Sequence, residues 1–86
     1  MNNMTEYVVT IKNDDYPLTY RAKTITNAFM CLIAAEQNHH LDNSPSFLDR
    51  DKLMEDLVRM KNNQLTKTET IAYVLERVVT EDREGA

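Results

Sequence analysis

Residues 65–79, LTKTETIAYVLERVV, decide the fold of this chain. A helix is indicated by Thr66 and Glu69, which fit a capping box, and by apolar residues at helical spacing behind them. A strand is indicated by the many β-branched and aromatic residues and by the alternating pattern of IAYVL. We expect a strand, because it would give a third strand to a hairpin that the N-terminal half predicts.

That N-terminal hairpin is indicated by two alternating segments, residues 6–12 and residues 18–24. Between them lies NDDYP, whose Asn, Asp and Pro residues favour a turn. One face of the hairpin would carry the apolar side chains of Tyr7, Val9, Ile11, Leu18, Tyr20 and Ala22. A hairpin alone is marginally stable in water, so another element must cover this face.

The next segment, AFMCLIAA at residues 28–35, is apolar throughout and lies within a predicted helix over residues 27–39. Thr24 or Thr26 can serve as its N-cap. Large side chains form one stripe: Phe29, Leu32 and Ile33, ending at Glu36. Short side chains form a second stripe: Cys31, Ala34, Ala35 and Asn38. The large stripe suits packing against the hairpin, and the small one allows another helix to approach closely.

A second helix is predicted from residue 46 or 47 to residue 61. Its apolar face would consist of Leu53, Met54, Leu57, Val58 and Met60. Its solvent face would consist of Asp51, Lys52, Glu55, Asp56 and Arg59. The sequence KNNQ is a suitable end, because asparagine tolerates the left-handed conformation that often terminates a helix.

Together these elements predict a small α+β domain over residues 5–80, in the order β-β-α-α-β, flanked by short polar tails at residues 1–4 and 81–86. The alternative order is β-β-α-α-α, if the last segment is helical. A chain of 86 residues leaves room for one such domain.

Composition excludes several classes of function. The single glycine lies near the C-terminus, so glycine-rich phosphate loops cannot form. With 14 acidic and 10 basic residues, the net charge of −4 disfavours nonspecific binding to nucleic acid. The one cysteine suits a reducing compartment. The N-terminus resembles no signal peptide, and the apolar runs are too short to span a bilayer, so we expect a cytoplasmic protein without membrane contact.

Few residues in the sequence suggest a metal site or a catalytic site. His39 and His40 are followed by Asp42, but neighbouring histidines on a helix diverge, and Cys31 lies two turns away among apolar residues. We therefore expect no metal, no cofactor and no enzymatic activity. One alternative is a ligand- or metal-dependent site near His39 and His40, formed at a dimer interface.

Basic residues of the hairpin suggest a different alternative. Lys12, Arg21 and Lys23 could contact phosphates on its solvent face, and would then bind nucleic acid. Exposed aromatic residues for base stacking are missing from that face, because the tyrosines are expected on the other side. The methionines of the helices, Met30, Met54 and Met60, could line an adaptable groove or fill gaps in the core.

The first helix is apolar over more of its surface than a single hairpin covers. We therefore expect a homodimer, with Cys31, Ala34, Ala35 and Asn38 at the interface. The leading functional hypothesis is a small cytoplasmic protein that acts by binding another protein. It would be an accessory protein or an inhibitor, of the kind that mobile elements encode.

Overall fold

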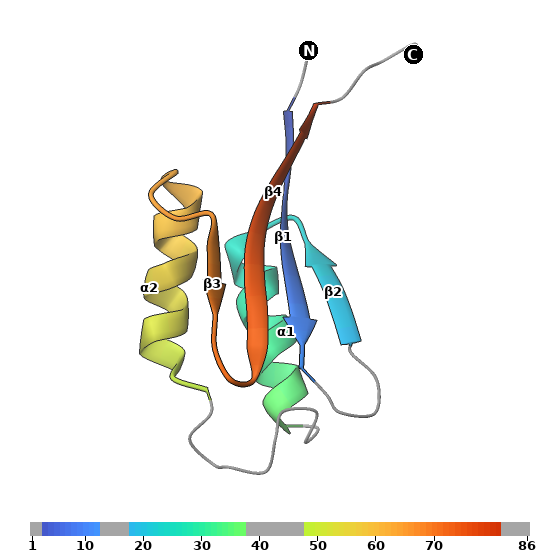
Figure 1. The fold of residues 1–86 in the computed structure, drawn as a ribbon, viewed down its shortest axis with the longest axis vertical. Helices are drawn as coiled ribbons and strands as arrows, with labels where there is room; N and C mark the ends of the chain where they lie inside the picture. The colour runs from blue at the N-terminus through green and yellow to red at the C-terminus, as the bar shows by residue number, and fades with distance from the viewer. Residues whose placement is uncertain (1–2, 13–17, 38–47, 82–86) are drawn as a thin grey trace.

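The computed structural model describes residues 3–12, 18–37 and 48–81, which form a four-stranded antiparallel sheet with both helices on one face (Figure 1). The elements along the chain are β1 (Asn3–Ile11), β2 (Leu18–Ala22), α1 (Ile25–Gln37), α2 (Arg50–Lys61), β3 (Lys67–Glu69) and β4 (Tyr73–Glu81). The predicted α+β class is confirmed. The final segment is extended, so the helical alternative is wrong.

The strands lie in the order β2-β1-β4-β3, which makes the first and last strands of the chain the central pair. Val9 lies opposite Tyr20 on one side and opposite Leu75 on the other. The sequence predicted one strand over residues 65–79, whereas the structure divides this segment into β3 and β4. Thr66 caps no helix: its carbonyl oxygen accepts a hydrogen bond from the Arg77 N–H at 2.8 Å, next to the β3–β4 ladder.

A threonine hydroxyl organises the turn between β3 and β4. The Thr70 Oγ1 accepts hydrogen bonds from the N–H groups of Ala72 and Tyr73, at 3.2 and 3.1 Å. The Thr70 N–H in turn donates to the Tyr73 carbonyl at 2.8 Å. Ile71 at the tip is 74% exposed, whereas Ala72 is buried. Threonine and backbone thus close the turn without the glycine that tight hairpins usually employ.

The core lies between the sheet and the helices, and the alternation predicted for the hairpin is confirmed. Tyr7, Val9 and Ile11 are buried on the face that α1 covers. α1 contributes Ala28, Leu32, Ile33 and Ala35, and α2 packs beside α1 and contributes Leu53, Leu57 and Met60. The sheet and α2 therefore cover much of the apolar surface of α1.

Ala35 corrects one prediction about that surface. Its side chain is 2% exposed within the single chain, so it belongs to the core and not to an outer interface. The reason is helical spacing: Ala28, Leu32 and Ala35 follow one another at i, i+4 and i+7 and share the inward face. Phe29, expected in the core stripe, is only partly buried.

Side chains cap the N-terminus of each helix. The Thr24 Oγ1 accepts a hydrogen bond from the Asn27 N–H at 3.0 Å, so Thr24 caps α1, which begins at Ile25. The Asp49 side chain accepts from the Lys52 N–H at 3.1 Å, so α2 begins three or four residues later than expected. Each cap satisfies an N–H group that has no partner within the helix.

The C-terminus of α2 ends as predicted, with an asparagine in the left-handed conformation. Asn63 has φ of 61°. Its N–H donates to the Met60 carbonyl at 3.1 Å, and the Gln64 N–H donates to the Arg59 carbonyl at 2.8 Å. These two bonds make a Schellman motif, which satisfies carbonyls of the last helical turn.

Two residues of α2 lie on the opposite side from the one predicted. Asp56 is 5% exposed and Val58 is 41% exposed. Asp56 shares the spacing i, i+3, i+4, i+7 with the core residues Leu53, Leu57 and Met60, which turns it inward. Its carboxylate accepts a hydrogen bond from the Lys52 Nζ at 2.9 Å, which compensates the buried charge.

The central strands extend beyond the rest of the sheet (Figure 1). β2 ends at Ala22, opposite Tyr7, and β3 begins at Lys67, opposite Glu76. β1 and β4 continue as a two-stranded ribbon to the pair of Asn3 and Glu81, slightly past the expected domain limits. Neither helix in the described part of the chain is long and apolar enough to cross a membrane.

Candidate binding groove between β2 and α1

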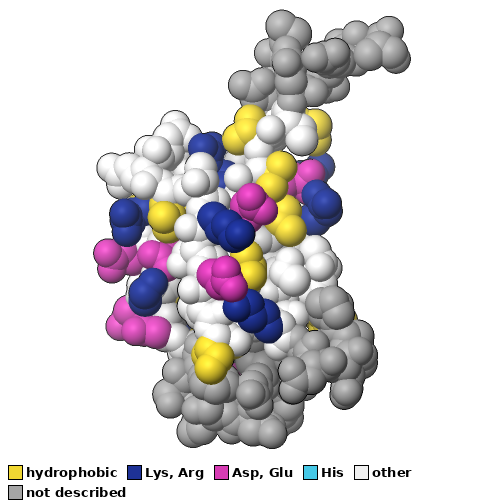
Figure 2. Space-filling view, viewed as in Figure 1, with side chains coloured by type: hydrophobic (Ala, Val, Ile, Leu, Met, Phe, Trp, Pro, Cys, Tyr) yellow, Lys and Arg dark blue, Asp and Glu magenta, His cyan; other side chains and the backbone are white. Residues whose placement is uncertain are grey.

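The sheet has one face that neither helix covers, which we call the open face. Its side chains follow from the register of the strands: Glu6, Val8, Thr10, Thr19, Arg21, Lys67, Glu69, Val74, Glu76 and Val78. Figure 2 shows this face, with a broken line of hydrophobic side chains among charges of both signs. A mixed surface of this kind suits contact with water.

The structure does not bring the three candidate phosphate contacts into one basic patch. Lys12 forms an ion pair with Glu69, and the Arg21 Nη1 lies 3.8 Å from the Glu6 Oε2. Lys12 also lies four residues along β1 from the partner of Arg21, about 13 Å away at the usual rise of a strand. Lys23 makes no ion pair within the described residues.

The Lys12 ammonium lowers the pKa of its partner, Glu69. Its hydrogen bond and its charge hold the pKa of the exposed Glu69 carboxyl below the usual value, and Lys67 adds a smaller effect in the same direction. This pair links the end of β1 to β3 across β4. It stabilises the carboxylate form and leaves Lys12 less free to bind a phosphate.

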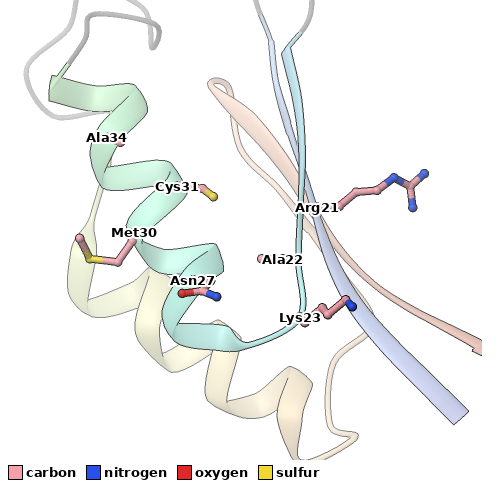
Figure 3. Close-up of a pocket in the computed structure, with 7 residues that line it drawn as sticks. All are labelled: Arg21, Ala22, Lys23, Asn27, Met30, Cys31 and Ala34. Atoms are coloured by element: carbon pink, nitrogen blue, oxygen red, sulfur yellow. The ribbon is translucent and has the colours of Figure 1, made fainter. Parts of the chain in front are cut away.

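A groove of about 620 Å³ lies between β2 and α1, at the edge of the sheet (Figure 3). Arg21, Ala22 and Lys23 line it from the strand side, and Asn27, Met30, Cys31 and Ala34 line it from the helix. In Figure 3 Cys31 points from the helix toward the strand, whereas Arg21 and Lys23 point away from the helix. The groove therefore has an apolar helix wall and basic residues behind its strand wall.

Several residues singled out in the sequence meet in this groove. Cys31 is half-buried and Ala34 is exposed. Met30, a candidate for an adaptable surface, is 55% exposed, whereas Met60 belongs to the core. Asn38, the remaining interface candidate, lies outside the described residues. Ala22 and Asn27 line the groove as well. The sequence had placed Ala22 on the apolar face of the hairpin and had given Asn27 no role at a surface.

The strand wall of the groove is also an edge of the sheet. β2 pairs with β1 on one side only, and no other described strand pairs with its second side. In an antiparallel sheet every second residue of an edge strand directs its N–H and C=O groups away from the sheet. Backbone donors and acceptors of β2 therefore border the groove.

Another cluster of ionisable groups consists of Tyr73 at the start of β4 and of Asp49, Lys52 and Asp56 in and next to α2. Tyr73 is 3% exposed, and burial raises the pKa of its hydroxyl; the nearby carboxylates of Asp56 and Asp49 raise this pKa further. Lys52 neutralises Asp56, and Asp49 is the N-cap of α2. Each member of this cluster thus has a structural role.

In the described ranges no three His, Cys, Asp or Glu side chains lie close enough together to hold a metal ion. His39 and His40, the residues considered for a metal- or ligand-dependent site, lie outside those ranges. Cys31 is a free thiol that lines the groove.

Comparisons with protein-family models, with curated proteins and with solved structures found no match to this chain. Function can therefore be inferred only from the residues themselves. The groove between β2 and α1 unites an accessible, largely apolar helix wall, a strand edge that pairs with no other described strand, and nearby cations.

Proposed function

We propose that this chain is a non-enzymatic protein-binding module whose partner binds in the groove between β2 and α1. The observation that carries the proposal is the position of this groove beside an open strand edge. Apolar walls supply nondirectional binding energy, and a strand edge supplies directional hydrogen bonds. A groove of this size falls within the range of natural ligand sites.

The accessible side chains of α1 support the same proposal. Met30 and Ala34 remain exposed although the neighbouring Leu32 and Ile33 are buried. Methionine adapts its shape to different partners, and alanine allows close approach of another backbone. A partner would bury this surface and complete the covering of α1.

Nucleic-acid binding through Lys12, Arg21 and Lys23 has less support. Lys12 is already paired with Glu69 and lies about 13 Å along the sheet from Arg21, so the three cations do not form one basic patch. A single cysteine and the absence of catalytic motifs in the sequence support a binding protein of the cytoplasm, which would act as an accessory protein or an inhibitor.

The proposal is tested by affinity enrichment from a lysate of the source organism, followed by mass spectrometry. Ala34→Arg places a long charged side chain on the helix wall of the groove. Glu55→Arg is the matched control, because Glu55 is exposed on α2 and does not line the groove. We expect a specific partner with the wild-type chain and with Glu55→Arg, and its loss with Ala34→Arg. Capture that is equal in all three chains would contradict the proposal.

The same groove could instead be the interface of the homodimer that the sequence predicts. With Ala35 in the core, such a contact would depend on Cys31 and Ala34. Light scattering over a concentration series measures the mass. A dimer that Ala34→Arg converts to a monomer would identify a second copy as the occupant of the groove.

A further inference from the structure

We infer that the groove binds an extended acidic segment of the partner, which joins the sheet as a fifth strand beside β2. This inference rests on the proposed function and specifies the partner's chemistry. The added strand would direct acidic side chains toward Arg21 and Lys23, and small apolar side chains toward α1.

The backbone of β2 supports strand addition. A new strand would lie about 4.8 Å from β2, in the direction in which the sheet would continue. It would pair with the N–H and C=O groups that β2 does not use with β1. The groove borders this edge, and no strand of the described residues occupies the position next to β2. Strand addition of this kind is an established mode of peptide recognition.

The residues of α1 that line the groove determine which side chains of the added strand could face the helix. Ala22 points toward α1 from the strand, and Cys31 points toward the strand from the helix (Figure 3). Side chains of an added strand alternate between the two faces of the sheet, so every second one would lie over Cys31 and Ala34. These are short and largely apolar neighbours, which favour small or medium apolar side chains.

The positive charges of Arg21 and Lys23 determine which side chains of the added strand could face the open face of the sheet. Residues 16–35 include Arg21 and Lys23 but no Asp or Glu, in a chain whose net charge is −4. Arg21 and Lys23 point away from α1, toward the open face (Figure 3). Glu6 lies on β1, across β2 from any added strand, and its contact with Arg21 is long at 3.8 Å. Outward side chains of the added strand would therefore meet local positive charge.

The same charges disfavour a second copy as the occupant. Pairing of β2 with its own copy would bring two sets of Arg21 and Lys23 to one edge. Like charges across neighbouring strands destabilise a pairing, whereas opposite charges stabilise it. An acidic segment of another protein would complement both the positive charge of Arg21 and Lys23 and the apolar surface of α1. A second copy of β2 would complement only the apolar surface.

Short synthetic peptides provide the test. One peptide alternates Val and Glu, a second alternates Val and Lys, and a third contains the residues of the first in blocks. Titration calorimetry measures affinity, and NMR hydrogen exchange measures protection of the β2 amides. We expect the alternating acidic peptide to bind at least about tenfold more tightly than the basic one. We also expect every second amide of β2 to become protected.

Charge reversal supplies the matched variants. The double variant Arg21→Glu and Lys23→Glu should reverse the preference, so that the Val/Lys peptide binds more tightly. The control is Arg59→Glu with Lys61→Glu, which changes the net charge equally at exposed positions of α2. This control should retain the wild-type preference for the acidic peptide.

Three results would overturn the inference. These are an equal affinity for acidic and basic peptides, peptide binding without protection of β2, and no binding of either alternating peptide. Each leaves the proposed function standing if Ala34→Arg still abolishes capture of the natural partner. If Ala34→Arg has no effect on capture, the proposed function fails instead.

Discussion

Individual charged residues of this domain act mainly on their immediate neighbours. Lys12 and Glu69 illustrate this, because both are exposed and come from segments far apart in the sequence. An exposed ion pair contributes little to the free energy of folding, since water screens it. Its effect on the pKa of the carboxyl is nevertheless a local property that can be measured.

Replacement of Lys12 by Gln should raise the pKa of Glu69 toward the usual value for glutamate. Lys12 provides both of the largest lowering effects, whereas Lys67 provides a smaller one, so Lys67→Gln should change this pKa less. NMR titration of the Glu69 side-chain carboxyl measures both variants. A lowered pKa means that the contribution of the pair to stability is present above the usual pKa and is lost as the pH falls through the lowered one. An unchanged Glu69 titration in Lys12→Gln would contradict the ion pair.

Asp56 shows the limit of sequence interpretation at this scale. A charged residue among charged neighbours indicates a solvent face, yet helical spacing places Asp56 with the core residues. Lys52 makes this burial tolerable from one turn away, because its flexible side chain reaches the carboxylate. The charge of Asp56 predicts that its side chain is exposed. Its burial follows only from its position on the helix relative to Leu53, Leu57 and Met60.

At the scale of elements, the ends of the helices are determined by a few side chains. Asp49 is the clearest case, because its carboxylate accepts from the Lys52 N–H and its carbonyl accepts from the Leu53 N–H. It also carries a negative charge at the positive end of the helix dipole. The start of α2 therefore depends on one residue.

Asp49→Ala should lower the free energy of unfolding by about 1 kcal/mol, the usual cost of losing an N-cap. Asp49→Asn should retain most of the stability, since asparagine caps helices about equally well. Urea unfolding, followed by circular dichroism, measures the three chains. A loss in Asp49→Asn as large as that in Asp49→Ala would show that the cap is not the cause.

The sequence predicted the β1–β2 hairpin, both helices and the final strand from alternation and helical spacing. It placed residues 65–79 in one strand and did not predict the division into β3 and β4, because no glycine or proline marks the turn between them. Within the groove, the stripe of short side chains included Cys31, which is half-buried, and Ala34, which is exposed; their role at an interface stays a prediction. The positions of Ala22 and Asn27 in the groove could not be predicted, because the groove arises from the way β2 and α1 pack together, and no local pattern encodes that packing.

For the molecule as a whole, Tyr73 connects the helical layer to the sheet. Its ring is buried in the core, and the carboxylates of Asp49 and Asp56 on the α2 side lie near its hydroxyl. Ionisation of this hydroxyl would place a negative charge in an apolar region beside other negative charges. Folding therefore favours the neutral form, and the domain loses stability at alkaline pH.

Stability should fall as the pH rises above about 10, the usual pKa of tyrosine. The folded pKa of Tyr73 is raised, so its contribution is fully present below the unfolded pKa and is lost as the pH rises through the folded one. Tyr73→Phe removes this contribution to the pH dependence while keeping the ring. Urea unfolding of both chains at several alkaline pH values measures the difference. Parallel stability curves for the two chains would contradict the raised pKa.

The central position of β1 and β4 also governs how the chain reaches its native state. These strands are the most distant in the sequence, and yet they form the longest ladder of the sheet. Closing so long a loop opposes folding entropically before any of the ladder's bonds can form, which slows folding. Until β4 arrives, β1 exposes one complete edge, and an exposed edge invites pairing with other chains. Newly made chains are therefore most vulnerable to aggregation before their final strand takes its place.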